Sequence, residues 1–215
     1  MSAHVAHQFN DAAQQRESAA LGMWSFLVTE VMFFGGVFTA YAVYRDAYFE
    51  AFVAGSQHLD RVLGTVNTAV LLTSSLCAAL AVHAAQTNQR RALVGYLAGT
   101  MLLGGVFLGV KVYEYWDKFQ HHLVPGYDFQ WPADSSGLVD PRHVELFYSF
   151  YFAMTGIHAV HMIIGIALFM VILVRAARGR YSHEYYNPVE IMGLYWHFVD
   201  IVWVFLFPLL YLIES

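Results

Sequence analysis

Five long apolar runs, separated by polar connections, set the pattern along this chain. Each run is longer than the roughly 20 residues that an α-helix needs to cross the apolar core of a bilayer. The runs cover residues 19–44, 63–85, 92–116, 145–174 and 188–213. They predict an all-α fold: a polytopic membrane protein whose five transmembrane helices form one bundle. Residues 1–18, before the first run, are expected to form a polar N-terminal tail.

The connections between the runs are short, except for residues 117–143. This longer connection contains Pro125-Gly126, Trp131-Pro132 and Ser135-Ser136-Gly137, combinations that favour turns. No connection is long enough for a separate soluble domain, and the chain shows no internal repeat. We therefore expect a single membrane domain over residues 19–215.

The composition agrees with a membrane protein and excludes several other classes. Hydrophobic residues make up 58% of the chain and charged residues 13%, whereas a soluble domain has about 25% charged residues. The net charge of −5 comes without a basic run, so we expect no nucleic-acid partner. Cys77 is the single cysteine. A single cysteine excludes an internal disulfide, a paired-cysteine copper site and a Cys-x-x-Cys-His haem attachment.

Basic residues are distributed unevenly between the two sides of the membrane that the five runs define. The side with the N-terminus and the second and fourth connections carries Arg16, Arg90, Arg91, Arg175, Arg178 and Arg180. The opposite side carries Arg45, Arg61, Lys118 and Arg142. Because basic residues accumulate in cytoplasmic connections, we expect the N-terminus inside and the C-terminus outside. No basic segment precedes a short apolar stretch, so no cleaved signal peptide is expected.

Two ionisable residues lie near the middle of the last run, where the surroundings are most apolar. His197 and Asp200 are three residues apart, a spacing that puts both on one face of a helix. A carboxylate at the centre of a bilayer costs several kcal/mol unless it is paired or neutralised. A partner for Asp200 is therefore expected on a neighbouring helix.

The fourth run contains two histidines, His158 and His161, that share a helical face. Three interpretations stay open: core residues bonded to acids of other helices, ligands of a metal or haem, and members of a proton relay. A haem held between helices needs one histidine from each of two helices, and His158 with His197 would supply such a pair. Alternatively, a histidine of this run in contact with Asp200 would neutralise both groups at little cost.

Glu30 lies near the middle of the first run. One interpretation is a carboxyl kept neutral by burial or hydrogen-bonded to a neighbouring helix. The other is a group that handles protons or gates lipid, because an acid inside the membrane is a functional candidate by default. Glu30, His158, His161, His197 and Asp200 are together predicted to cluster at one depth.

Several other residues have the spacing of helix-packing positions. Asn67 and Ser74 share one face of the second run and are expected to form contacts between helices. Lys111 and Glu114 have the spacing of an ion pair at the end of the third run. Close packing of the third run is predicted at Gly95-x-x-x-Gly99 and Gly105-x-x-x-Gly109. A packing stripe along the last run is predicted at Trp196, Asp200, Trp203 and Phe207.

Four stretches together resemble subunit III of the haem–copper respiratory oxidases, the family of cytochrome c and ubiquinol oxidases. They are Trp24–Phe34 around Glu30, Asn67–Ser75, Met154–Gly165 with both histidines, and Glu190 followed by Tyr195–Phe205. Tyr113-Glu114-Tyr115 is similar to a Glu-Tyr pair of the family. The resemblance is collinear over about residues 20–212. It is to the five-span bacterial form, because long family members carry two further spans before the one with the glutamate.

The resemblance implies a non-catalytic core subunit of a terminal oxidase in aerobic electron transport, in the first place a cytochrome c oxidase. Such a subunit carries no haem or copper of its own. It packs on subunit I, which holds these groups, in one complex with subunit II and a small subunit IV. It supports proton uptake and protects the oxygen site during turnover. The expected location is the bacterial inner membrane.

The resemblance also assigns a set of polar positions to the bundle. They are the intramembrane residues Glu30, His158, His161, Glu190, His197 and Asp200, with Glu114 at the membrane interface. We expect structural, lipid-related or proton-related roles for them, and neither catalytic nor ligand roles. Long members of the family bind phospholipid in a cleft between their first two spans and their other five spans. This chain lacks those two spans, so a bound phospholipid would need a cleft built differently.

Other functions fit the same residues. The chain would serve equally as subunit III of a ubiquinol oxidase or as an accessory protein of a nitric oxide reductase, because these complexes differ in groups that subunit III does not touch. From a different class, a membrane cytochrome b would use His158 and His197 as haem ligands. A proton-coupled transporter would use Glu30, but it needs an inverted repeat or a pair of broken helices, and the sequence shows neither.

Overall fold

The computed structural model describes residues 8–126, 128–131, 139–183 and 185–213. Its helices are α1 (Ala12–Ala47), α2 (Phe49–Gln57), α3 (Arg61–Gln86), α4 (Arg90–Gln120), α5 (Pro141–Ala177) and α6 (Asn187–Tyr211). All except α2 are long and apolar enough to cross a membrane. Within the described ranges the only β-type pairing is an isolated bridge between Ser182 and Tyr185. The predicted all-α fold with five spanning helices is confirmed.

The helices extend beyond the apolar runs that predict them. α1 begins at Ala12, inside the predicted polar tail, because the Asp11 carboxylate accepts a hydrogen bond from the Gln14 amide at 2.7 Å. Asp60 and Asp140 cap the first turns of α3 and α5 in the same way. Apolar residues mark the part of a helix inside the bilayer, whereas the capping residue sets where the helix starts. Residues 12–18 of the predicted polar tail are therefore helical.

The first connection contains a short helix, α2, that the pattern of apolar runs does not predict. α2 packs on α5, where Phe52 is completely buried and its ring lies 5.5 Å from that of Phe147. The sequence pattern identifies only apolar runs long enough to cross a membrane. This segment is shorter than that, so the pattern does not indicate a helix here. The turn predicted at Ser135-Ser136-Gly137 lies outside the described residues.

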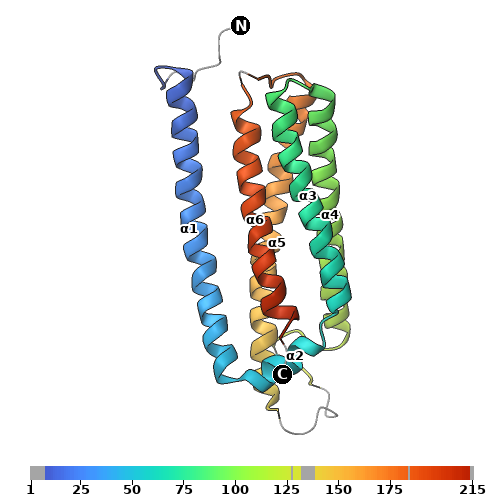
Figure 1. Ribbon diagram of the computed structural model, residues 1–215. Coiled ribbons are helices and arrows are strands. Elements are labelled where there is room, and N and C mark those ends of the chain that lie inside the picture. The colour runs from blue at the N-terminus through green and yellow to red at the C-terminus, as the bar shows by residue number, and fades with distance from the viewer. Residues whose placement is uncertain (1–7, 127, 132–138, 184, 214–215) are drawn as a thin grey trace.

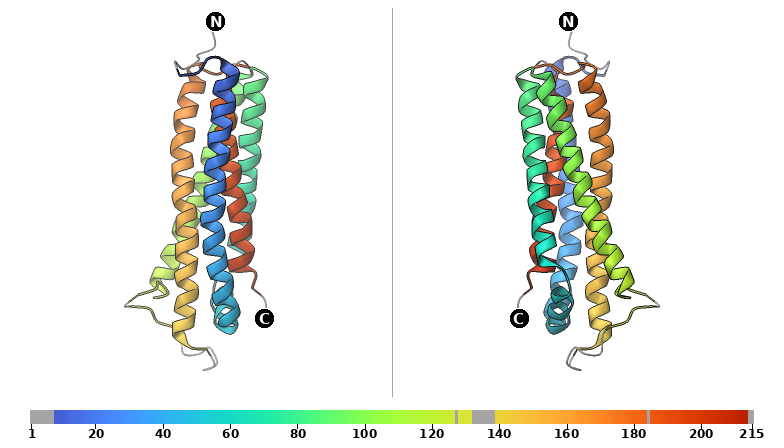
Figure 2. Two further views of the ribbon diagram at one scale, coloured as in Figure 1. Left: turned by 90° about the vertical axis from the view of Figure 1, so that its left-hand side faces the viewer. Right: turned by 90° about the vertical axis from the view of Figure 1, so that its right-hand side faces the viewer.

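Four of the spanning helices, α3 to α6, form a compact group, and α1 stands to one side of it (Figure 1). α6 contacts α1, α3 and α5, and it is the most buried of the five. The N-terminal end of α1, the α3–α4 turn and the α5–α6 loop lie at one end of the molecule, and α2 lies at the other (Figure 2). This alternation follows from five spans joined by short connections.

The centre of the group is Trp196 of α6, whose side chain is completely buried. Its ring lies against Gly104 of α4 and Gly165 of α5, where an added Cβ atom would come within 2.9 Å and 2.8 Å of it. The indole N–H donates to the Ser74 hydroxyl of α3 at 3.1 Å. One side chain of α6 thus touches three other helices, and the two glycines make room for it.

The glycine pairs that the sequence predicts as packing positions are not the ones used. Among the described residues, a Cβ atom added at Gly95, Gly105 or Gly109 would meet no other atom within 4 Å, and at Gly99 it would meet only Cys77 at an ordinary 3.7 Å. The predicted close packing between helices of this chain is therefore not found at these glycines, and Gly104 takes that role. A four-residue spacing identifies a common helical face but does not show which face is turned inward.

The contacts predicted for Asn67 and Ser74 are confirmed. The Asn67 amide donates to the Phe107 carbonyl at 3.3 Å, and the Ser74 hydroxyl donates to the Thr100 carbonyl at 3.0 Å. Both bonds join α3 to α4. The packing stripe predicted on α6 is also present, since Trp196, Asp200 and Trp203 are buried.

Candidate functional site

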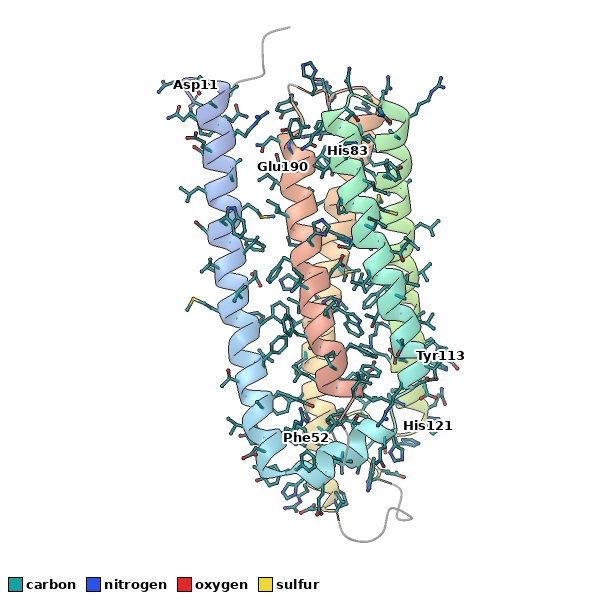
Figure 3. All side chains as sticks on the ribbon, in the orientation of Figure 1. Asp11, Phe52, His83, Tyr113, His121 and Glu190 are labelled. Atoms are coloured by element: carbon teal, nitrogen blue, oxygen red, sulfur yellow. The ribbon has the colours of Figure 1, made fainter. Side chains whose placement is uncertain are left out.

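The predicted intramembrane residues do not form one cluster. They occupy separate places: a pair between α1 and α5, a group between α3 and α6, and a histidine enclosed among aromatic rings. Glu190 lies apart from all of these, in the first turn of α6 and near the same end of the molecule as Asp11 (Figure 3). An acidic residue at that position is favoured by the partial positive charge of the helix N-terminus. Among the polar positions that the resemblance assigns to the bundle, Glu190 is thus the one at a helix end.

Glu30 and His161 form a pair that joins α1 to α5. The Nε2 atom of His161 lies 3.2 Å from a carboxylate oxygen of Glu30, and both side chains are mostly buried. The Nδ1 atom of His161 lies 2.9 Å from the Ile157 carbonyl. A carbonyl only accepts, so Nδ1 carries a proton and donates it. Nε2 then either accepts from a protonated Glu30 or donates to a carboxylate, and in both states a single proton is shared between the two residues.

His197, Ser75 and Asp200 meet between α6 and α3. The Ser75 hydroxyl lies 2.5 Å from Nδ1 of His197. Ser75 also faces the carboxyl group of Asp200. Neither oxygen of Asp200 has a hydrogen bond of ordinary geometry within the described part of the chain, although the residue is only 2% exposed. Ser75 is thus a polar neighbour of Asp200, but the partner expected to pair with this carboxyl group is not found among the described residues.

His158 is enclosed by the rings of Phe107, at 5.5 Å, and Trp203, at 5.2 Å. It is 1% exposed, and neither ring nitrogen has a hydrogen-bond partner among the described residues. Among the described residues, no contact joins a histidine of α5 to Asp200, although one was expected. His158 faces α4, Asp200 faces α3, and His161 is bonded to α1 instead. His158 is therefore a buried residue among aromatic rings, and within the described part of the chain it does not make the bond to an acid that the first interpretation requires.

The most densely bonded polar group is one that the sequence indicates only in part. Lys111 and Glu114 of α4 form the predicted ion pair at 2.7 Å, and both are almost completely buried. The Tyr211 hydroxyl of α6 accepts from Lys111 at 2.5 Å and donates to Glu114 at 2.9 Å. The Lys111 ammonium also lies 4.5 Å from the centre of the Trp203 ring. Glu114, expected at the interface, is thus held inside the bundle by a lysine and a tyrosine.

Two members of these groups have no individual signal in the sequence. Tyr211 lies far along the chain from Lys111, and nothing in its own segment marks it as the partner of an ion pair. Ser75 is one of several hydroxyl residues in its run, each compatible with ordinary helix packing. Among the described residues, no three His, Cys, Asp or Glu side chains come together in a way that would hold a metal ion.

Between α1 and α6 lies an apolar groove of about 390 Å³. Its lining residues are Val31, Phe34, Gly35, Phe38, Phe198, Ile201, Val202 and Phe205. Phe34 also contacts the ring of His161, at 5.4 Å. The Glu30–His161 pair is therefore next to a surface that suits an apolar chain.

Comparison with known proteins places these features in a family context. A family model described as cytochrome c oxidase subunit III matches residues 143–215, which include α6 and all of α5 except its first two residues. Cytochrome c oxidase subunit 3 of Thermostichus vulcanus is 30% identical over 94% of this chain and 90% of its own length. The protein of that name from Corynebacterium diphtheriae is 30% identical over 94% and 95%. Cytochrome bo(3) ubiquinol oxidase subunit 3 of Pseudomonas aeruginosa is 27% identical over 98% and 92%.

Proposed function

Because the chain belongs to the cytochrome c oxidase subunit III family, we propose that it is a non-catalytic core subunit of a haem–copper terminal oxidase. In this role it packs directly on subunit I, alongside subunit II and a small subunit IV, and supports proton uptake and the stability of the oxygen site. The observation that carries the proposal is a similarity that extends over nearly the whole chain and over nearly the whole of those relatives.

The arrangement of the polar residues supports a structural role. The ion pair and hydrogen bonds of Glu30, His197 and Glu114 are made with other helices or within the bundle. They join α1 to α5, α3 to α6 and α4 to α6, and none needs a cofactor as a partner. Haems and copper then belong to the partner subunits, and this chain contributes scaffolding and a proton-sharing pair at Glu30.

The identity of the relatives favours a cytochrome c oxidase over a ubiquinol oxidase. Relatives named cytochrome c oxidase subunit 3 are 30% to 33% identical to the chain, whereas quinol oxidase subunits are 25% to 28% identical. The two kinds of complex differ in the chain that receives electrons. We therefore propose cytochrome c as the electron donor of the whole complex, with a quinol as the alternative.

The membrane orientation we propose has the N-terminus in the cytoplasm and the C-terminus outside, in a bacterial inner membrane. The arginine-rich end contains the N-terminus of α1, the α3–α4 turn and the α5–α6 loop (Figure 1). Basic residues favour the cytoplasmic side.

The groove between α1 and α6 has the apolar lining that a phospholipid chain requires.

Purification of the tagged chain from its native membrane tests the function directly. The expected result is a complex that contains a haem-bearing subunit and a second subunit with a two-copper, cytochrome c-docking domain. Recovery with a copper-free second subunit would assign the chain to a ubiquinol oxidase instead. A b-type absorption band in the isolated chain, lost on His158→Ala or His197→Ala, would overturn the proposal in favour of a membrane cytochrome.

A further inference from the structure

The end of α5 is built so that three arginines surround one small space. α5 ends at Ala177, and Gly179 follows with a φ of +71°. In this turn the Gly179 N–H donates to the Ala176 carbonyl at 2.9 Å and the Arg180 N–H donates to the Arg175 carbonyl at 3.1 Å. Two hydrogen bonds between Ser182 and Tyr185, at 3.3 Å and 2.9 Å, close the following turn. The backbone that positions these arginines is thus held by its own hydrogen bonds.

This space is a pocket of about 320 Å³. Its lining residues are Arg175, Arg178, Arg180, Tyr181 and Tyr185. Three arginines and two tyrosines line it, and none of these described lining residues is acidic. Guanidinium groups bind phosphate oxygens through paired N–H donors. The chemistry of the lining is therefore that of a phosphate site.

Tyr181 gives an independent indication of a ligand. The residue is only 8% exposed, and its hydroxyl has no hydrogen-bond partner of ordinary geometry among the described residues. Its ring is stacked on that of Tyr185, with the centroids 6.1 Å apart. Burial raises the pKa of the Tyr181 phenol, and the Arg175 guanidinium, which the hydroxyl faces, partly opposes this shift. The hydroxyl is therefore neutral at physiological pH and can donate to an anion.

Neighbouring arginines at this end of the molecule have other contacts. The Arg90 guanidinium donates to the Ala177 carbonyl at the end of α5. The Arg16 guanidinium lies 5.1 Å from the centre of the Tyr186 ring. Arg178 and Arg180, by contrast, are exposed at the pocket. The pocket arginines are thus distinct from those that secure the helix ends.

An apolar surface leads from the pocket toward the membrane along α5. Val171 and Val174 are 48% and 42% exposed. Val171, Val174, Arg175 and Arg178 have the spacing of residues on one helical face. A molecule with a phosphate at one end and an acyl chain at the other would match this face. Basic residues on the cytoplasmic side meet the leaflet that is rich in anionic lipid.

We propose that the pocket at the α5–α6 loop binds a phosphate group, carried by an anionic phospholipid whose acyl chains lie along the exposed face of α5. Arg178 and Arg180 hold the phosphate oxygens, and the Tyr181 hydroxyl donates to one of them. The shared chemistry is a phosphate anion, so inorganic phosphate from the cytoplasm is the second source to be tested. The site is separate from the groove between α1 and α6.

The test uses the intact oxidase complex, purified in a neutral detergent and depleted of lipid. Binding of phosphatidylglycerol, phosphatidylcholine and inorganic phosphate is measured by native mass spectrometry and by the shift in thermal midpoint. Wild type is compared with the double variant Arg178→Gln/Arg180→Gln and with Tyr181→Phe. Arg91→Gln is the matched control, because Arg91 is an exposed arginine at the same end of the molecule that does not line the pocket.

The double variant is expected to bind phosphatidylglycerol roughly thirtyfold more weakly, with phosphatidylcholine binding unchanged and Arg91→Gln equal to wild type. Tyr181→Phe is expected to weaken phosphatidylglycerol about threefold, since only one donor is lost. A stabilising effect of millimolar phosphate, lost in both variants, would support the site with the free anion as its ligand. Equal phosphatidylglycerol binding by wild type and the double variant, with no phosphate effect, would overturn the proposal. If Tyr181→Phe binds phosphatidylglycerol as tightly as wild type, the lipid is held by general attraction to a basic surface, and the proposed pocket is contradicted.

Discussion

α6 and α1 are both apolar spans, yet they relate to the rest of the protein in opposite ways. In the most apolar stretch of α6, 56% of the residues are buried inside the protein, compared with 17% in α1. α6 inserts Trp196 and Trp203 into the centre of the group, and each indole N–H donates to a hydroxyl of α3. α1 exposes large side chains such as Leu21, Met32 and Val43.

α1 is held mainly at a few points along its length. The Glu30–His161 pair secures its middle, and the Tyr41 hydroxyl donates to the Leu209 carbonyl at 2.5 Å near its end. Arg16 lies over the Tyr186 ring at the other end. The comparison shows that crossing the membrane and packing into the protein are separate properties. The exposed face of α1 is available to lipid or to a partner subunit, whereas the exposed face of α6 is smaller and includes Ile201 and Phe205.

The largest effect that distinguishes the two helices is expected from Trp196→Ala. Removing this side chain empties the space between Gly104 and Gly165 and leaves the Ser74 hydroxyl without its donor. We expect a loss of about 4 kcal/mol in the free energy of unfolding, measured by unfolding in mixed detergent micelles. The matched control is Phe205→Ala, an exposed aromatic of the same helix. Equal losses in both variants would contradict the central place of Trp196.

Lys111→Met is expected to have the next largest effect. It leaves the Glu114 carboxylate buried without its cation, which costs about 3 kcal/mol. The same unfolding measurement detects it, and the double variant Lys111→Met/Glu114→Gln should recover most of the stability. Failure of the second change to restore stability would show that the lysine acts through packing on Trp203 rather than through its charge.

Glu30→Ala is expected to have a smaller effect, confined to the attachment of α1. Polar contacts between membrane helices are worth about 0.6 kcal/mol on average, so the loss should be about 1 kcal/mol or less. The assembled oxidase should keep its haem content but release this subunit more readily, or lose activity faster during turnover. Val31→Ala, at an exposed neighbour, serves as the control. Immediate and complete loss of oxygen reduction in a fully assembled complex would contradict a supporting role.

The smallest effect is expected from Met32→Ala, because this side chain is 73% exposed on α1. The free energy of unfolding of the isolated chain should change by less than about 0.5 kcal/mol. A larger loss of subunit from the assembled complex, measured by the stoichiometry after detergent extraction, would identify this face of α1 as the contact with another subunit.

Much of the architecture follows from the sequence alone. Five apolar runs determine five spans, because no shorter or more polar segment crosses a bilayer. Spacing along one helix also determines which residues can pair locally, and the Lys111–Glu114 ion pair is an example. The resemblance carried by Trp24–Phe34, Met154–Gly165 and Tyr195–Phe205 identifies the family, because these residues occur in a specific order and combination.

The choice of partners is decided only by the tertiary structure. The sequence places Glu30, His158, His161 and Asp200 near one depth, but Glu30 pairs with His161 while His158 and Asp200 face different neighbours. Gly104 packs against Trp196, and the regularly spaced glycines beside it do not. The physical reason is that helical periodicity defines a face without its direction. Which face turns inward, and what it meets, depends on how each helix is rotated and tilted against the others.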